Sequence, residues 1–135
     1  GPLYGPAADA GERVLLPFLR FSGVDRVHRL VLSHRDSDHA GGMAALLAAL
    51  PVASQRSSFA GDPAEHCRAG ERWQWDGVDF AFLHPLAAAY TVDRAKPAKS
   101  NHLSCVLRIS AGGRHLLLTG DIEAPDEARL LAEAP

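Results

Sequence analysis

Four potential metal ligands lie within six consecutive residues of this 135-residue chain, and no other feature restricts its fold as strongly. The four are His34, Asp36, Asp38 and His39. An apolar, β-branched stretch at residues 27–33 precedes them and is typical of a buried strand. Residues 43–50 form a helix-favouring stretch that ends before Pro51. The order of strand, polar loop and helix predicts an α/β fold, with the ligand cluster in the loop at the carboxyl end of the strand.

The residue types in this loop are those that bind divalent metal ions. Carboxylates crowded on a short loop destabilise it unless a cation compensates, and imidazole with carboxylate is a ligand set for transition metals. A solvated acidic loop is the competing interpretation, and the density of ligand groups favours metal binding over it. Alternate residues of an extended segment point to one side, so we expect His34, Asp36 and Asp38 to converge while His39 turns toward a second centre.

Turn-forming residues predict two β-hairpins. In the first, strands at residues 73–75 and 78–82 flank Asp76-Gly77, a pair favoured in type I′ turns. The second is expected from strands at residues 103–109 and 115–119, joined through residues 111–113.

Three further segments have simpler signals. Apolar residues recur at helical spacing over residues 11–21, although Pro17 should kink or shorten that helix. Residues 86–100 lack periodicity and predict a long exposed loop. Pro125 and the acidic residues after it are typical of the first turn of a C-terminal helix.

Composition narrows the class of partner. Hydrophobic residues make up 47% and charged residues 22% of the chain, as in an ordinary globular domain. The formal net charge of −2 gives no long-range attraction for a polyanion, so metal ions or a neighbouring domain would have to supply it for a nucleic acid. No stretch approaches the ~20 apolar residues of a membrane-spanning helix, and we expect no membrane contact by this segment itself.

The two cysteines allow two interpretations. Cys67 and Cys105 lack the close spacing of a zinc knuckle, so they are either two buried apolar thiols or one disulfide. A disulfide would fit an oxidising compartment.

Several motifs resemble those of the metallo-β-lactamase superfamily. Residues 33–42 resemble its histidine-and-aspartate signature, and residues 118–121 resemble its later strand that ends in a metal-bridging aspartate. Within the superfamily, the chain is most similar to the soluble domain of ComEC-type DNA-internalisation competence proteins. The similar segments are residues 73–78, 83–85, 101–107 and 117–123, together with Asp36 where most members have a second histidine.

The resemblance implies that the ligands divide between two metal ions. The ligands expected for the first ion are His34 and Asp36, those for the second are Asp38 and His39, and Asp121 would bridge the two. Asp38 and Asp121 are the expected catalytic residues, since Asp38 could also orient the nucleophile. Because the carboxylate of Asp36 replaces an imidazole, Mn²⁺ or Mg²⁺ is favoured, with Zn²⁺ as the alternative.

Other polar residues near these motifs are interpreted either as further metal ligands or as structural residues. Asn101, or His102 beside it, falls about where the family supplies a further ligand. His102 is equally well interpreted as a surface histidine on a strand edge. His84, which precedes Pro85, is expected to be structural.

The resemblance implies a fold and a domain organisation. We expect one metallo-β-lactamase-like domain over residues 1–135, built as an αββα sandwich of mixed sheets with flanking helices. The family's first strands and its last ligand segment are expected to lie outside this sequence. The isolated chain is therefore not necessarily active.

The implied function is that of a metal-dependent phosphodiesterase. Two divalent cations ~4 Å apart can stabilise both the attacking and the leaving oxygen of a phosphodiester. We expect a nuclease domain of a DNA-uptake protein that degrades one strand of incoming DNA. It would lie at the periplasmic or extracellular face of a bacterial inner membrane, with the membrane channel domain of the parent protein as its partner.

Two other functions compete with this one. A small-molecule ester, thioester or lactone hydrolase of the same fold is favoured by a weakly charged, apolar cleft. A groove lined by Arg56, Arg94, Lys96 and Lys99 would favour nucleic acid instead. The second competing function is not catalytic: a truncated structural or interaction module whose ligands are vestigial and bind no metal.

Overall fold

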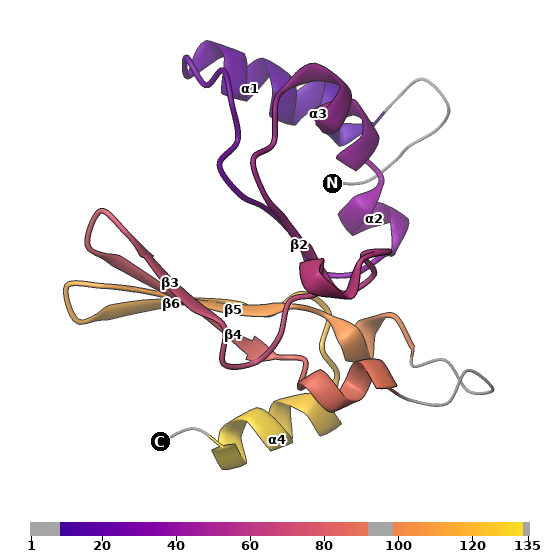
Figure 1. Ribbon diagram of the computed structural model, residues 1–135, viewed down its shortest axis with the longest axis vertical. Helices are drawn as coiled ribbons and strands as arrows, with labels where there is room; N and C mark the ends of the chain where they lie inside the picture. The colour runs from indigo at the N-terminus through magenta and orange to yellow at the C-terminus, as the bar shows by residue number, and fades with distance from the viewer. Residues whose placement is uncertain (1–8, 92–98, 134–135) are drawn as a thin grey trace.

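Two sheets and their flanking helices form four layers in the computed structural model, which describes residues 9–91 and 99–133. The first sheet is a parallel pair of β1 (Leu30–Leu32) and β2 (Gln55–Ser57). The second is antiparallel, in the order β3 (Arg72–Trp75), β4 (Val78–His84), β5 (Val106–Ala111) and β6 (Arg114–Leu118). Beyond the first sheet lie α1 (Leu16–Phe21) and α3 (Met43–Ala49), and beyond the second lies α4 (Ala124–Glu133) (Figure 1). The α/β class and the αββα order expected from the sequence are confirmed.

The N-terminal helix forms despite its proline. A π-helical turn, η1 (Gly11–Leu15), runs directly into α1, so the helix predicted over residues 11–21 is confirmed. Pro17 is the second residue of α1, so it lies just after the point where π-helical hydrogen bonding changes to α-helical. Gly11 has no side chain and so allows η1 to contact the backbone of Gly42, just before α3.

The strand predicted at residues 27–33 is shorter than expected. Its regular part is β1, and Val27 adds an isolated bridge to Val52. Its partner β2 was not predicted, because the sequence Gln-Arg-Ser has no hydrophobic alternation and becomes a strand only by pairing with β1. The helix predicted before Pro51 is confirmed as α3.

The prediction that residues 34–39 are all loop was wrong in its second half. Ser37–Ala40 forms a single helical turn, α2, with Asp36 in an extended conformation at its N-cap position. The backbone N–H groups of His39 and Ala40 both donate to the carbonyl of Asp36, which closes the turn. Asp38 and His39 therefore lie on a helix and not on alternating sides of an extended segment.

Both predicted hairpins are present. Asp76 and Gly77 have φ values of 48° and 78°, as a type I′ turn between β3 and β4 requires. The second hairpin joins β5 to β6 through Gly112 and Gly113. Its first strand begins at Val106, three residues later than predicted, because η4 (Asn101–Leu103) forms a 3-10 turn in which Ser104 N–H donates to the carbonyl of Asn101.

The segment predicted as a long exposed loop, residues 86–100, is only partly loop. It begins with a 3-10 helix, η3 (Ala87–Thr91), and residues 92–98 lie outside the described residues. Tyr90 fastens η3 to the core by donating its hydroxyl hydrogen to the carbonyl of Cys67 at 2.7 Å. The C-terminal helix predicted around Pro125 is confirmed as α4.

The two sheets share a core that contains a disulfide. Cys67 and Cys105, which are 38 positions apart, form a disulfide. Of the two interpretations of the cysteines, the structure therefore has the disulfide and not two free thiols. Phe82 and Leu107 are buried with them, and Val31 of β1 packs against this cluster from the first sheet. The core thus fixes β1 against β4 and β5. Among the described ranges, no helix has both the length and the hydrophobicity to cross a membrane.

Candidate metal centre

The ends of two strands from different sheets bring the predicted ligands together. His34 lies two residues after β1, and Asp121 lies three residues after β6. A backbone hydrogen bond from Cys105 N–H to the carbonyl of Ser33 joins the second sheet to this loop. The early loop and the carboxylate after Gly120 therefore meet, as the family signature implied.

Three side chains form the centre of this cluster. One ligand atom each from His34, His39 and Asp121 lies within 4.8 Å of the other two. His39 Nε2 lies 3.3 Å from one carboxylate oxygen of Asp121, and His34 Nε2 lies 3.9 Å from the other oxygen. The bridging position that the resemblance implied for Asp121 is therefore geometrically available.

Asp36 and Asp38 each lie beside one of the two imidazoles. An Asp36 oxygen is 3.6 Å from His34 Nε2, and an Asp38 oxygen is 3.4 Å from His39 Nε2. The pairing follows the division that the resemblance implied, with His34 beside Asp36 and His39 beside Asp38. Both aspartates are more exposed than the histidines, so they form the solvent side of the cluster.

His34 is fully buried, and its Nε2 atom has no hydrogen-bond partner among the described residues. A buried polar atom without a hydrogen bond destabilises a fold unless some other group compensates it. Burial, followed by the neighbouring His39 ring at 4.2 Å, lowers the pKa of His34 below its ordinary value of 6.5. The neutral imidazole that this environment favours is the form that binds a metal ion.

Two serine hydroxyls contact the Nδ1 atoms of the imidazole rings, on the side away from the carboxylates. Ser33 Oγ lies 3.0 Å from His34 Nδ1 and 3.3 Å from His39 Nδ1. Ser104 Oγ lies 3.3 Å from His34 Nδ1 and accepts a hydrogen bond from the Asp121 backbone N–H at 3.2 Å. The Nδ1 atoms thus contact hydroxyls, and the Nε2 atoms face the carboxylates.

Gly120 allows the two strand ends to approach closely. Its φ value is +56°, and a Cβ atom placed on it would lie 2.9 Å from Ser104 Cβ and 3.0 Å from Ser33 Cβ. A side chain would be strained there by the backbone and would also collide with both serines. The glycine therefore sets the distance between Asp121 and the early loop.

Asn101 and His102 contact a different set of acidic residues. Asn101 Nδ2 lies 3.4 Å from Glu123, and His102 Nδ1 lies 2.7 Å from Asp126 on α4. Within the described ranges, His102 is not part of the metal-capable group of two histidines and an aspartate. The structure therefore brings together five of the seven predicted ligands.

His84 has the structural surroundings expected for it. It is buried, and its Nδ1 lies 2.8 Å from the carbonyl of Ser104. Burial lowers its pKa, while the hydrogen bond to Ser104 acts in the opposite direction.

Sequence reasoning missed the two serines that contact the histidines. Ser33 and Ser104 carry no metal-binding signal of their own, and small polar residues at strand ends are common. Their positions directly beside His34 and within the Asn101–Leu107 motif were the only available indication.

An open pocket adjoins the cluster between the two sheets. It has a volume of about 640 Å³, and Asp38 and His39 contribute to its lining. Aliphatic side chains of β1, β5 and β6 line another part of it, among them Leu32, Leu107 and Leu118. Arg56, expected to line a basic groove, is instead held by Glu71 at 2.9 Å, and Arg94 and Lys96 lie outside the described residues.

Comparison with known proteins identifies the family. The model of the metallo-beta-lactamase superfamily matches residues 4–133. The chain belongs to the metallo-β-lactamase superfamily. This membership agrees with the αββα layers and with the position of the ligand cluster at the strand ends.

Three curated relatives of this metallo-β-lactamase domain have informative names. Competence protein ComA of Neisseria gonorrhoeae is 43% identical over 129 residues, which cover 92% of this chain and 17% of ComA. Recombination protein 2 of Haemophilus influenzae is 35% identical, with 86% and 14% covered. ComE operon protein 3 of Bacillus subtilis is 30% identical, with 93% and 17% covered. The chain thus spans less than a fifth of the length of these relatives.

Proposed function

We propose that this domain is a metal-dependent hydrolase that binds two divalent cations in the cluster of His34, His39 and Asp121. The observation that carries the proposal is the fully buried His34 ring, whose Nε2 faces two carboxylates without a hydrogen bond. A metal ion would bind that nitrogen atom, and its positive charge would offset the repulsion between the carboxylates.

The spacing of the donor atoms supports this assignment. Ligand atoms that share one ion at about 2.1 Å stand roughly 3.0 Å apart in an octahedral site and roughly 3.4 Å apart in a tetrahedral zinc site. The separations between Nε2 atoms and carboxylate oxygens are 3.3 to 3.9 Å, which is longer than a hydrogen bond of a charged pair. The donor set supports the proposal that His34 and Asp36 would hold one ion, that Asp38 and His39 would hold the other, and that Asp121 would serve both.

The identity of the metal and the full ligand set remain predictions. The number of carboxylates favours Mn²⁺ or Mg²⁺, and Zn²⁺ is the alternative. A further ligand from Asn101 or His102 also stays a prediction. In this structure Asn101 contacts Glu123, just before α4, and His102 contacts Asp126 on α4.

The reaction we propose is phosphodiester cleavage in incoming DNA. When bound, two divalent cations polarise a phosphodiester and lower the pKa of water. We propose that Asp38 accepts a proton from a nucleophile that enters from the pocket, and its exposed position beside His39 supports this role. The relative named competence protein ComA supports a role in DNA uptake.

The proposed location is the periplasmic or extracellular face of a bacterial inner membrane. A buried disulfide supports an oxidising compartment. A membrane channel domain of a longer parent protein is the proposed partner, and DNA, as a single strand or a duplex end, is the proposed substrate.

Metal binding is tested first, by isothermal titration of the protein with Mn²⁺ and with Zn²⁺. His34→Ala and Asp121→Asn should each weaken binding by at least about 100-fold, since each removes a direct ligand. Asp79→Asn serves as the control, because Asp79 lies on β4 and is bonded to Gln74. Equal affinity of all four proteins would contradict the proposed site and would favour a module with vestigial ligands.

Cleavage is tested next, with single-stranded and double-stranded DNA in the presence of Mn²⁺. Asp38→Ala should lower the rate by about 100-fold or more if Asp38 handles the proton. Cleavage that survives the substitution would exclude the nuclease mechanism proposed for this residue.

The pocket favours one second candidate function. Its aliphatic walls are suited to an apolar acyl group, and so they favour a small-molecule ester, thioester or lactone hydrolase. The same proteins should be assayed on a short acyl ester and on a lactone. Metal-dependent turnover of these substrates without DNA cleavage would replace the nuclease with this alternative.

A further inference from the structure

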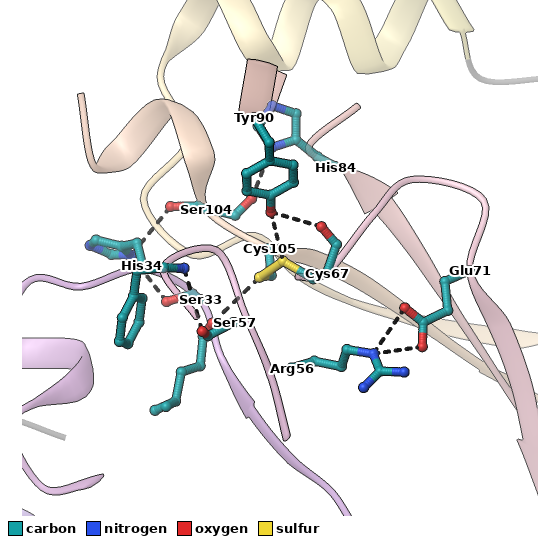
Figure 2. Close-up of a disulfide and its surroundings, with 12 residues drawn as sticks. Ser33, His34, Arg56, Ser57, Cys67, Glu71, His84, Tyr90, Ser104 and Cys105 are labelled. Carbon is teal, nitrogen blue, oxygen red and sulfur yellow. Dashed lines mark hydrogen bonds and ion pairs between the residues drawn. A yellow bond between two sulfur atoms is a disulfide. The ribbon is translucent and has the colours of Figure 1, made fainter. Parts of the chain in front are cut away.

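Two serines link the histidines to the backbone that carries Asp121. Ser104 is fully buried, and Ser33 lies directly before His34 in the sequence. We refer to Ser33 and Ser104 as the serine pair. Both hydroxyls contact Nδ1 of His34, and Figure 2 shows the two serines beside that ring. The carboxylates of the cluster lie near Nε2 on the other side of the ring.

The serine pair is itself held rigidly. The carbonyl of Ser104 lies 2.8 Å from His84 Nδ1, and Ser104 N–H donates to the carbonyl of Asn101 at 2.9 Å. Figure 2 shows Ser104 between His34 and His84, next to the disulfide that fixes Cys105. Cys105 N–H in turn donates to the carbonyl of Ser33 at 2.8 Å, so the backbones of the two serines are joined.

A serine hydroxyl can donate one hydrogen bond and accept two, so it can pair with either tautomer of an imidazole, and a metal ion on Nε2 would select the tautomer that donates from Nδ1. Ser104 Oγ already accepts the Asp121 N–H, and a hydroxyl oxygen can accept a second hydrogen bond. An imidazole with its hydrogen on Nδ1 can donate to the serine pair and leaves its Nε2 lone pair toward the carboxylates. The opposite tautomer would point an N–H group at the place where the metal is proposed to bind.

We propose that Ser33 and Ser104 are positioning residues that hold His34 and His39 in the Nδ1–H tautomer and tie His34 to Asp121. This inference rests on the metal site proposed above and adds the side chains that orient its ligands. Groups that fix the second nitrogen of a metal-binding histidine contribute about 10- to 100-fold to metal affinity in other sites.

The tautomer is measured without any substitution. Nitrogen-15 NMR spectra of the protein titrated with Zn²⁺, at pH of about 8, distinguish rings that bind the metal through Nε2 and keep the hydrogen on Nδ1 from rings with the hydrogen on Nε2. We expect Nδ1–H for His34 and His39. Spectra with Nε2–H at His34 would overturn the inference.

The affinity test compares Ser33→Ala, Ser104→Ala and the double variant with wild type by titration with Mn²⁺ and Zn²⁺. Each single substitution should weaken binding by about 10-fold or more, and the histidine signals should shift toward a mixture of tautomers. Ser57→Ala is the matched control, because Ser57 is also buried but its Oγ contacts Phe59 N–H.

The possible outcomes separate this inference from the proposed function. If wild type binds metal and both serine variants bind it equally well, the inference is wrong and the metal site stands. If wild type binds neither Mn²⁺ nor Zn²⁺, the proposed site fails and the inference fails with it.

Discussion

At the proposed metal centre, small residues and buried rings matter because they leave no space for a further side chain or for water. Gly120 excludes a side chain from the space between Ser33 and Ser104, and this lets Asp121 approach the early loop. His34 excludes water from its own Nε2 because the ring is fully buried. The site therefore depends on close packing around a few small residues, and a single methyl group should disturb it.

The residue-scale prediction concerns Gly120→Ala. The positive φ should cost about 1–2 kcal/mol for any residue with a Cβ atom, and contacts of 2.9 and 3.0 Å with the serines should add to this loss. Metal affinity should fall as well, since Asp121 must move. Denaturant unfolding and metal titration measure the two effects.

Gly112→Ala provides the matched control for this prediction. Gly112 has a nearly identical φ of +54°, but no atom of the described residues lies within 4 Å of its Cβ position. It should therefore lose stability by backbone strain alone and keep its metal affinity. If both variants unfold alike and bind metal alike, the close approach at Gly120 has no functional role.

At the scale of elements, short strands are held in place by links to their neighbours. The strand β1 has three residues and, within the described part of the chain, pairs with β2 alone, so its position depends on contacts with the second sheet. The disulfide between Cys67 and Cys105 lies at this junction, and the sulfur of Cys105 is 3.4 Å from the carbonyl of Leu32. The link between β5 and the segment before β3 therefore supports the loop that carries the ligands.

Removal of the disulfide should destabilise the whole domain. A loop closed over a 38-residue separation limits the unfolded chain, and its loss should lower the free energy of unfolding by about 2–4 kcal/mol. The double variant Cys67→Ala, Cys105→Ala is compared with oxidised and with reduced wild type in a denaturant titration. Reduced wild type should resemble the double variant, and an unchanged midpoint in both would refute the prediction.

At the scale of the whole molecule, the core and the site share one hydrogen-bonded framework. The interior of the second sheet ends in His84, whose ring contacts the backbone of Ser104 and lies 3.6 Å from Asp126 on α4. The second sheet, the segment before β5 and α4 are thereby connected through one buried side chain. Global stability should consequently depend on the protonation of His84.

The pH dependence of unfolding tests this connection in the metal-free protein. Burial is the main cause that lowers the pKa of His84, with Arg129 adding to it and Asp126 opposing it. The unfolded chain then binds more protons than the folded one, so stability is complete above pH 6.5 and declines as the pH falls toward the lowered pKa.

His84→Asn isolates this contribution, because its amide can still donate to the carbonyl of Ser104. The variant should show a shallower loss of stability below pH 6.5, and one site can account for at most about 1.4 kcal/mol per pH unit. Thermal unfolding from pH 5 to 8 provides the comparison. Parallel curves for variant and wild type would show that His84 does not titrate on unfolding.

The local sequence alone determined the elements that depend on short-range chemistry. Asp76-Gly77 defines a type I′ turn, Pro51 follows the end of α3, and the density of ligands at residues 34–39 predicts a metal site. Turn conformation and metal-ligand chemistry depend on residues close together in the chain, so a single sequence is enough to predict them. The family signature added Asp121, which lies far along the chain.

Only the tertiary structure decided which groups surround the ligands. Strand β2 exists because β1 pairs with it, and the helical turn α2 places Asp38 and His39 where an extended loop would not. The contacts of Ser104 with His34 and Asp121 join residues 70 and 17 positions apart, and His102 is drawn toward α4. Contacts between distant segments depend on how the layers pack, and no local pattern encodes that packing.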